Sequence, residues 1–423
     1  MSPTATVPVV SSGGPVRASE RIATLDIVRG FALLGIFIMN MPGFSTSFYA
    51  EADGSHLWTS LLDQRAEQIR DMLFSGKFNS MFSLLFGLGF TIQLGRLTAR
   101  DPESAAKHYW RRLLVLAGFA AVHVLVFWGG DVLHIYAVLG VLLYFLRNAS
   151  NRLIIGLIVG CLLYPAINGI LRLYVLTPDI VKQMVAQSQA WEASNNLAYG
   201  QGSFVAAARE HTRDFSHTYG EPLRLWGIFG FYMQMATTML LGLLIGKNNW
   251  VPRIPELMPK IRRLQWWALG LGIICALIFG ILKEMNRAPG PSPIKVVISL
   301  SYALCRLSMM CFYVLTIVRL AQSPVWQKRF APMAAAGRMP LTNYLGQTLM
   351  ATTLFYGWGF GYFGKVGPAL GLLLAFAIFF VIQVPLSLWW LRRFEFGPLE
   401  YLWRTLTYGR RPTPTIRPTP ATG

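Results

Sequence analysis

Charged residues are scarce in this chain, and acidic residues are the scarcer of the two signs. Of the 423 residues, 13% are charged and 54% are hydrophobic, and 38 Lys and Arg stand against 19 Asp and Glu. A soluble globular chain carries about 25% charged residues, so this composition excludes an ordinary soluble domain. The basic residues stand in short segments between apolar runs, which is the distribution that orients a membrane protein. The sequence therefore predicts a polytopic membrane protein that has the lipid bilayer, and no nucleic acid, as its partner.

Cysteine and the common catalytic motifs are also scarce. The four cysteines lie inside apolar runs without metal-ligand spacing, so we expect them to be packing residues: Cys161, Cys275, Cys305 and Cys311. The chain has no dinucleotide-binding glycine pattern, no P-loop, no GxSxG elbow and no HExxH helix. We therefore expect no metal site and none of the enzyme classes that these motifs mark.

The two ends of the chain are polar and low in complexity. Residues 1–20 are rich in Pro, Ser, Gly and Thr and lack the charged-then-apolar order of a cleaved signal peptide. We predict a disordered cytoplasmic lead over residues 1–20 and a similar tail over residues 410–423. Residues 21–409 are predicted to form a single transmembrane domain, because no fixed-period repeat and no second soluble domain is visible.

Apolar runs that are long enough to cross a membrane recur along this domain. A helix needs about 17 to 25 residues to span the hydrocarbon layer. Lys and Arg collect in alternate connections, and these residues mark the cytoplasmic side. The pattern predicts an all-α fold of about ten transmembrane helices with both termini cytoplasmic. The predicted spans are 26–46, 78–97, 112–129, 131–147, 153–176, 224–246, 265–283, 296–319, 340–358 and 367–391.

The first predicted span, "LDIVRGFALLGIFIMN", has a polar stripe along an apolar helix. Asp26, Arg29 and Asn40 fall on one face, because separations of 3, 11 and 14 residues are close to whole helical turns. Ionisable groups at membrane depth are costly, so they usually pair, face a cavity or have a function. The stripe therefore indicates a polar path through the membrane.

Two other ionisable residues are expected inside spans. His123 is expected near mid-bilayer, and Asp131 follows it at the outer turn. This order is typical of a histidine that acts as a general base and is oriented by an acidic residue. A buried histidine that bonds a neighbouring helix is the alternative. Arg306 lies deep in a predicted span and should have a buried anion or a water-filled cleft beside it, with a structural ion pair as the simpler reading.

A second polar face is predicted in "GRMPLTNYLGQTLMATTLF". Asn343 and Gln347 are one turn apart on that face, and polar residues at this spacing often only bind helices to each other. Arg338 stands at the mouth of the span, on the same predicted side of the membrane as Arg29. Two guanidinium groups at that rim are suited to binding phosphates.

The order of several motifs resembles one bacterial family along nearly the whole chain, from about Arg21 to Gly409. The motifs are "RIATLDIVRGFALLGIFIMN", "GKFNSMFSLLFGLGF", "GFAAVHVLVFWGGDVLHIYAVLGVLLY", "GRMPLTNYLGQTLMATTLFYGWGFGYFG" and "FEFGPLEYLWRTLTYG". Together they resemble the YeiB-like family, known as domain of unknown function 418, with a C-terminal motif region at about 224–409. The activity of that family is poorly defined.

The first motif is also similar to the "LD-x-x-RG" opening of heparan-alpha-glucosaminide N-acetyltransferase and other transmembrane acyltransferases. The resemblance matches Asp26, Arg29 and Gly30 to the opening, and Asn40 to an asparagine at the active centre. The catalytic histidine of that relative follows its asparagine closely. His56 is the one histidine in the corresponding segment here, but it lies farther from Asn40 than in the relative.

The resemblance implies a membrane acyltransferase that uses acyl-CoA, expected to be acetyl-CoA, from the cytoplasm. The acceptor would be a hydroxyl or amine of a sugar, lipid or small metabolite on the outer side. In this hypothesis Asp26, Arg29, Arg338, Asn343 and Gln347 line the coenzyme passage. Asn40 polarises the thioester, and His123 with Asp131 is preferred over His56 as the base.

Two other functions fit the same polar path. A transporter or flippase for a small metabolite or lipid intermediate would use the path without chemistry, and a sensor or assembly factor would use it only to hold helices together. The resemblance implies that the protein lies in a bacterial cytoplasmic membrane, and the sequence leaves open whether it forms a homodimer.

Overall fold

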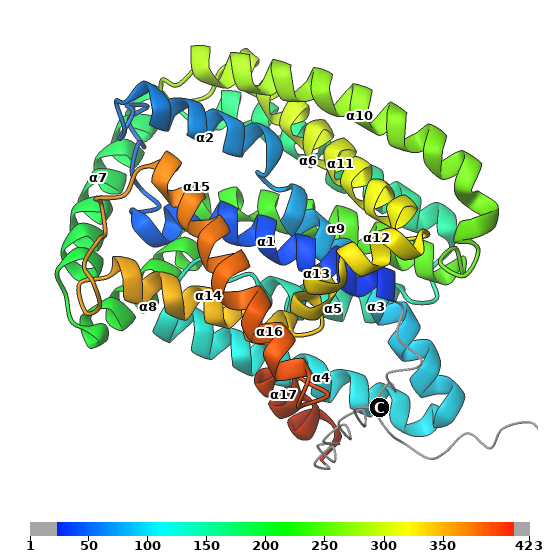
Figure 1. The fold of residues 1–423 in the computed structure, drawn as a ribbon. Coiled ribbons are helices and arrows are strands. Elements are labelled where there is room, and N and C mark those ends of the chain that lie inside the picture. Colours follow the sequence, from blue (N-terminus) through cyan, green and yellow to red (C-terminus); the bar gives the residue numbers. More distant parts are fainter. Residues whose placement is uncertain (1–22, 410–423) are drawn as a thin grey trace, which may run out of the picture.

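The computed structural model describes residues 23–409, in which helices joined by loops are the regular structure and no strand occurs (Figure 1). The helices are α1 (Ala23–Ser45), α2 (Leu61–Leu73), α3 (Lys77–Arg100), α4 (Pro102–Val122), η2 (His123–Phe127), α5 (Leu133–Leu146), α6 (Asn151–Val175), α7 (Pro178–Gly200), α8 (Phe204–Gly220), α9 (Pro222–Lys247), α10 (Ile254–Met285), α11 (Pro293–Leu320), α12 (Pro324–Arg329), α13 (Ala331–Gly337), α14 (Pro340–Phe355), α15 (Pro368–Ala377), η3 (Ile378–Gln383), α16 (Val384–Leu391) and α17 (Pro398–Tyr408). The predicted lead at 1–20 and tail at 410–423 lie outside the described residues.

The all-α, multi-pass membrane architecture is confirmed, with a smaller number of clear spans than predicted. Eight helical stretches of residues 23–409 are long and apolar enough to cross a membrane. The predicted spans 131–147 and 340–358 fall on α5 and α14, which have 14 and 16 residues. At about 1.5 Å per residue, both are shorter than the roughly 30 Å hydrocarbon layer. The count of ten and the cytoplasmic location of the termini therefore stay predictions.

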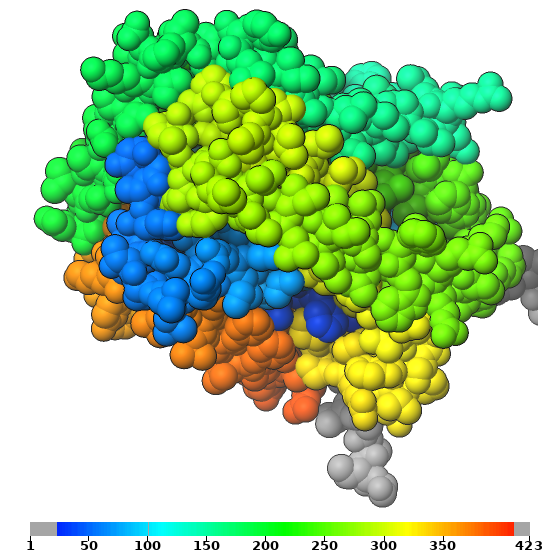
Figure 2. All heavy atoms as spheres, turned by 90° about the horizontal axis from the view of Figure 1, so that it is seen from above, coloured from blue at the N-terminus to red at the C-terminus, as the bar shows by residue number. Residues whose placement is uncertain are grey.

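α1 is the central helix of the bundle. It packs against α3, α13, α14 and α15, and most of its side chains are buried. α10 and α11 form a pair on the outside, where α10 presents apolar side chains such as Trp267 and Ile274 to its surroundings. Figure 2 shows this face, in which α10 and α2 are prominent and little of α1 is visible. The exposed apolar layer is what a bilayer requires of lipid-facing helices.

Two glycines set how closely α1 approaches α13. A Cβ atom on Gly30 would lie 2.0 Å from the carbonyl oxygen of Met333, and one on Gly337 would lie 1.9 Å from the carbonyl oxygen of Asp26. Small residues allow helix backbones to touch in this way. The close crossing brings Arg29 and Arg338, each next to one of these glycines, to the same end of the molecule.

Two π-helical segments direct polar side chains onto α14. His123 begins η2 and bonds Thr348, whereas Gln383 ends η3 and bonds Gln347. A π-helical turn re-aims a side chain within an otherwise regular helix and often occurs at functional sites. α14 therefore receives a buried polar contact from each of these two segments.

The predicted partner of Arg306 is not an anion. Its side chain is 2% exposed, and Nη1 donates to Ser80 Oγ at 2.6 Å and to the carbonyl oxygen of Gln234 at 3.2 Å. No carboxylate of residues 23–409 forms an ion pair with it, so the expected structural ion pair is wrong. Neutral oxygen acceptors solvate this guanidinium, as they often do for polar groups between membrane helices.

Candidate functional site

A cavity of about 330 Å³ lies at the end of the molecule where α1 begins. Its lining comes mainly from α1, α3, α4, α14 and α17, and its charged residues are Asp26, Arg29, Arg96, Arg112, Arg338, Glu400 and Arg404. The five arginines are all partly exposed. We call this the arginine cavity, and this end of the molecule the basic end.

Contacts within the lining hold several of these charges in place. Arg29 Nη1 donates to Asp26 Oδ1 at 2.6 Å, and the Arg112 guanidinium lies 4.2 Å from the centre of the Trp403 ring. Glu400 accepts hydrogen bonds of 2.6 Å from the Leu341 amide and from the Thr342 hydroxyl. Five guanidinium groups against two carboxylates leave an excess of positive charge, which suits phosphate groups.

The far part of the arginine cavity is apolar. Seven residues separate Arg29 from Ile36 on α1, a rise of about 10 Å. The residues around this part are mainly aliphatic or aromatic: Leu33, Ile36, Phe82, Leu85, Phe86, Phe90, Leu113, Leu116, Leu133 and Tyr136. Thr407, on α17 close to Arg404, also lines the cavity, and its buried hydroxyl has no hydrogen-bond partner among the described residues. The cavity as a whole is shaped for a ligand with an anionic head and an apolar chain.

His123 and Asp131 form the pair that their order in the sequence predicts. His123 Nδ1 lies 2.8 Å from Asp131 Oδ1, and His134 Nδ1 lies 2.8 Å from Asp131 Oδ2. His134 Nε2 contacts the Tyr219 hydroxyl at 2.5 Å. Burial alone would raise the pKa of Asp131, but the hydrogen bonds from the two histidines outweigh it and hold that pKa at about 2. Asp131 is therefore a permanent carboxylate, and it fixes the orientation of the His123 ring.

His123 lines neither the arginine cavity nor the second cavity described below. His123 is 1% exposed, and its Nε2 atom lies 2.9 Å from Thr348 Oγ1. The Tyr344 ring, which does line the arginine cavity, has its centre 5.3 Å from that of the imidazole. Val132, the residue after Asp131, is also part of the cavity wall. His123 and Asp131 thus lie behind the apolar wall of the arginine cavity.

The other predicted site residues fall into four places. Asp26, Arg29 and Arg338 line the arginine cavity together. Asn343 donates to the Ala336 carbonyl at 2.9 Å and Gln347 donates to Gln383 at 2.9 Å, so both bind helices to each other and neither lines a described cavity. 

Asn40, near the end of α1, is half-buried and also lines neither cavity. His56 lies in the loop between α1 and α2, where its Nε2 is 2.9 Å from Glu284 Oε1. The structure therefore brings the predicted phosphate-binding residues together, but it does not bring Asn40 or His56 to the arginine cavity.

Sequence reasoning missed three of the five arginines of the cavity. Arg96 and Arg112 were seen only as basic residues that orient the membrane, and Arg404 lies in the motif "FEFGPLEYLWRTLTYG" without having been singled out. Arg96 lies in the last two turns of α3, whereas Arg112 and Arg404 lie within α4 and α17. Their positions in the sequence do not show that these three helices meet around one cavity.

A buried acidic cluster under α7 and α8 was also missed. α8 packs on η2, and Ser47, just after α1, donates to Asn195 Oδ1 at 2.8 Å. Asn195 Nδ2 lies 3.3 Å from Asp214, which also accepts a bond of 2.6 Å from the Tyr199 hydroxyl. Burial, with the nearby charge of Glu210, raises the pKa of Asp214 to about 6. We call the end covered by α7 and α8 the cap end.

His211 stands between this cluster and His123. It is 2% exposed, its ring stacks on Tyr199 with centres 4.7 Å apart, and neither ring nitrogen has a hydrogen-bond partner among residues 23–409. Burial, followed by the charge of His123, lowers the pKa of His211 to about 3. The cap end therefore keeps a neutral histidine next to a carboxyl that titrates near pH 6.

Comparison with known proteins gives relatives without an assigned activity. The family described as "Protein of unknown function (DUF418)" matches residues 245–410. The chain is 30% identical over 409 residues to the uncharacterized protein YxaH of Bacillus subtilis, covering 94% of this chain and 97% of the relative. It is 29% identical over 417 residues to the uncharacterized protein YeiB of Escherichia coli, covering 92% of this chain and 96% of the relative. No solved structure matches the chain.

These relatives span the same length as this chain, so the likeness extends from the arginine cavity to the cap end. The acyltransferase likeness of the first motif has no counterpart among these matches. The chain belongs to the YeiB-like family of bacterial proteins that carry domain of unknown function 418.

Proposed function

We propose that this protein is a bacterial membrane acyltransferase that takes its acyl group from acyl-CoA. The observation that carries the proposal is the arginine cavity, where five guanidinium groups lead into an apolar interior. Acyl-CoA has the matching order of groups, because its phosphates are joined through a pantetheine arm to a thioester and an acyl chain. The basic end would face the cytoplasm, where CoA is found and where Lys and Arg collect.

The arginines would bind the phosphates of the coenzyme. Arg29 and Arg338 approach each other through the glycine contact between α1 and α13, and Arg112 is supported by Trp403. Guanidinium groups bind phosphate oxygens through paired hydrogen bonds, which fix both position and orientation. The acyl chain would then extend among Leu33, Ile36 and Phe86 and place the thioester near the wall formed by Tyr344.

His123 would act as the general base behind that wall. A carboxylate at Asp131 accepts the Nδ1 proton, so Nε2 holds the lone pair that accepts a proton from the acceptor hydroxyl or amine. The acceptor oxygen or nitrogen attacks the thioester carbonyl carbon, and the CoA thiolate leaves. Asn40 would polarise the carbonyl only after a rearrangement that brings it to the thioester, because it lines neither cavity. This step requires Thr348 to release Nε2 and requires Tyr344 to move, because the imidazole lines neither cavity.

The transporter or flippase remains the second candidate, and one observation favours it. Both ring nitrogens of His123 already have partners, as expected of a histidine that holds helices in place. A carrier for a phosphate-bearing lipid would use the same arginine cavity without any covalent step. The two functions differ in whether the thioester of a bound acyl-CoA is consumed.

The test measures binding and thioester loss separately, on protein purified in detergent. Titration with acyl-CoA should show saturable binding that the double variant Arg29→Ala/Arg112→Ala weakens. The control Arg213→Ala removes an arginine whose side chain is 57% exposed and lies on α8 at the cap end, so it should bind normally. Loss of thioester in the presence of acceptor candidates supports the transferase. Binding without any thioester loss would favour the transporter, and no saturable binding of acyl-CoA would contradict the transferase.

A further inference from the structure

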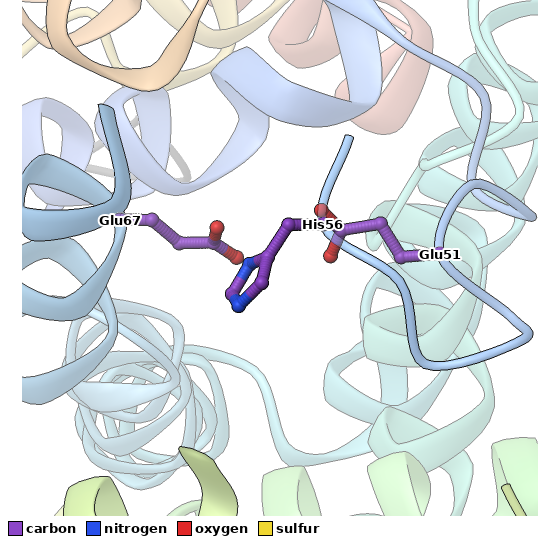
Figure 3. Close-up of side chains that lie close together, drawn as sticks. All are labelled: Glu51, His56 and Glu67. Atoms are coloured by element: carbon purple, nitrogen blue, oxygen red, sulfur yellow. The ribbon is translucent and has the colours of Figure 1, made fainter. Parts of the chain in front are cut away.

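A second cavity, of about 220 Å³, lies near the end of α1, where Glu51, Glu67 and Arg70 are part of its lining. We propose that Glu51, His56 and Glu67 bind a divalent transition-metal ion, of the zinc or manganese class, at the edge of this cavity. Ligand-type atoms of the three side chains all lie within 4.8 Å of one another. Figure 3 shows the three side chains pointing toward one another, with the imidazole between the two carboxylates. This site is independent of the proposed acyl transfer.

The histidine is already held as a metal ligand requires. His56 Nε2 lies 2.9 Å from Glu284 Oε1, and a carboxylate partner places the proton on Nε2. Nδ1 then carries a lone pair, is enclosed by protein, and has no hydrogen-bond partner within residues 23–409. Metal-binding histidines usually donate their other ring N–H to a carboxylate in this way. A bound cation would satisfy the enclosed Nδ1 atom.

The ion pairs around this site do not account for the enclosed Nδ1 atom of His56. Arg287 Nη2 lies 3.1 Å from Glu51 Oε2, and Arg70 Nη2 lies 3.4 Å from Glu67 Oε1, so both carboxylates are partly neutralised. Neither arginine bonds the histidine. If the ring were doubly protonated, Nδ1–H would need an acceptor, and no atom of residues 23–409 forms a hydrogen bond with Nδ1. The three side chains therefore bring ligand-type atoms together at one place.

The ligand set selects the class of ion. One imidazole nitrogen with two carboxylate oxygens suits Zn²⁺ or Mn²⁺, whereas Mg²⁺ and Ca²⁺ prefer oxygen ligands alone. Ligand atoms on one Zn²⁺, at about 2.0 to 2.2 Å from the ion, lie closer together than these atoms do, so a small rotation of the side chains must accompany binding. Because Glu51 and Glu67 also line the second cavity, the remaining coordination position would face that cavity.

Metal content and binding of the purified full chain test the proposal directly. After chelation and dialysis, the wild type should take up one equivalent of added Zn²⁺ or Mn²⁺, gain thermal stability with either ion, and ignore added Mg²⁺. Co²⁺ should give the visible absorption of a site with nitrogen and oxygen ligands. His56→Gln and Glu67→Gln should abolish stoichiometric uptake, and Glu284→Gln should weaken it roughly 10- to 100-fold, as expected for a residue that orients a ligand.

The matched control is His108→Gln, since His108 bonds only the Ser104 carbonyl on α4 at 2.9 Å and should leave uptake unchanged. Circular dichroism and size-exclusion chromatography establish that each variant is folded. Uptake below one equivalent in the wild type, or equal uptake in His56→Gln and the wild type, would overturn the proposed site. Neither result would bear on acyl-CoA binding, which is measured at the other end of the molecule.

Discussion

The two ends of α1 have opposite electrostatic character. At its start, Arg29 belongs to a partly exposed cavity lined by five arginines. Past its other end, Ser47 bonds Asn195 within a closed cluster that contains the buried carboxyls of Glu210 and Asp214. The basic end is thus suited to receive an anion from solvent. At the cap end Ser47, Asn195, Tyr199 and Asp214 bond one another, and the ring nitrogens of His211 lack a partner within residues 23–409.

This difference indicates which end of the molecule is suited to bind the coenzyme and which end keeps the proposed catalytic side chains in position. Polar groups that face a cavity remain available to a ligand, whereas buried polar groups that bond each other fix side chains in place. His123 and Asp131 belong to the second kind, and they adjoin the cap through His211 and His134. Substitutions at the basic end should therefore alter the affinity for the coenzyme, and substitutions of His123 or Asp131 should alter the rate of acyl transfer.

The largest expected effect is that of His123→Gln on the rate of transfer. Removal of a positioned general base lowers a rate by a factor of about 10² to 10⁴. Coenzyme affinity should be nearly unchanged, because His123 does not line the arginine cavity. Single-turnover kinetics with saturating acyl-CoA measure the rate, and a parallel titration measures the affinity.

His56→Gln is the matched comparison, since His56 lies away from the arginine cavity and should leave the transfer rate unchanged. A severe loss at His56 alone would assign the base to the segment that follows Asn40, as in the heparan-type relative. If neither variant slows transfer, the role of His123 is only to hold helices together.

The next effect is that of Gly337→Ala on stability at the basic end. The added Cβ would lie 1.9 Å from the Asp26 carbonyl oxygen and 2.6 Å from the Gly30 amide nitrogen, so α1 and α13 must separate. Overpacking of this kind typically costs about 1 to 3 kcal/mol, and contact with rigid backbone on both sides puts this change at the upper end. Thermal unfolding in detergent should show a clear loss.

Gly118→Ala on α4 is the control, because its added Cβ would meet nothing within 4 Å. It should leave the unfolding temperature unchanged or raise it slightly, since alanine favours a helix over glycine. Equal stability of the two variants would mean that the crossing of α1 and α13 is looser than the structure shows.

Arg29→Ala should weaken coenzyme binding more than it slows transfer. A charge-assisted contact at a partly exposed cavity contributes about 1.5 to 3 kcal/mol, and a phosphate contact is made equally in the ground state and the transition state. Titration should show the weaker affinity, and the single-turnover rate at saturation should stay near that of the wild type. An unchanged affinity in a folded variant would remove Arg29 from the binding site.

The smallest expected effect is that of Asp214→Asn on the pH dependence of stability. The pKa of Asp214 is about 6 in the folded protein against an ordinary value of 3.8, so between these values the folded state holds a proton that the unfolded state has released. The stability of the wild type should therefore fall as pH rises from 4 to 6, by roughly 1 to 3 kcal/mol from this group. Asp214→Asn should lack that fall.

The wild type must be compared with Asp214→Asn, because His211 changes the stability of the protein with pH in the opposite direction. Its pKa is about 3 in the folded protein against an ordinary value of 6.5, so its contribution to stability grows as pH rises through this window. Thermal unfolding of wild type and variant at pH 4.5 and pH 7 isolates the contribution of Asp214, since His211 is common to both. Parallel profiles would mean that Asp214 titrates normally.

The sequence by itself determined the class of protein and the local partners. A composition with few charges leaves apolar runs that only a bilayer or a helical bundle can accommodate, so an all-α membrane protein followed directly. The pairing of His123 with Asp131 was also predictable, because the two residues are only eight positions apart, on either side of the turn that follows η2. The helical period placed Asp26 next to Arg29 for the same local reason.

Only the tertiary structure decided which distant groups share a site. The five arginines come from α1, α3, α4, α17 and the end of α13, and the contact of Gly30 and Gly337 brings two of them, Arg29 and Arg338, to the same end. Asn343 and Gln347 share a helical face, yet neighbouring helices and η3 occupy their hydrogen bonds, so the face that was expected to bind coenzyme holds the bundle together. Sequence periodicity fixes which side of a helix a residue takes, whereas packing of other helices decides whether that side meets a cavity or another side chain.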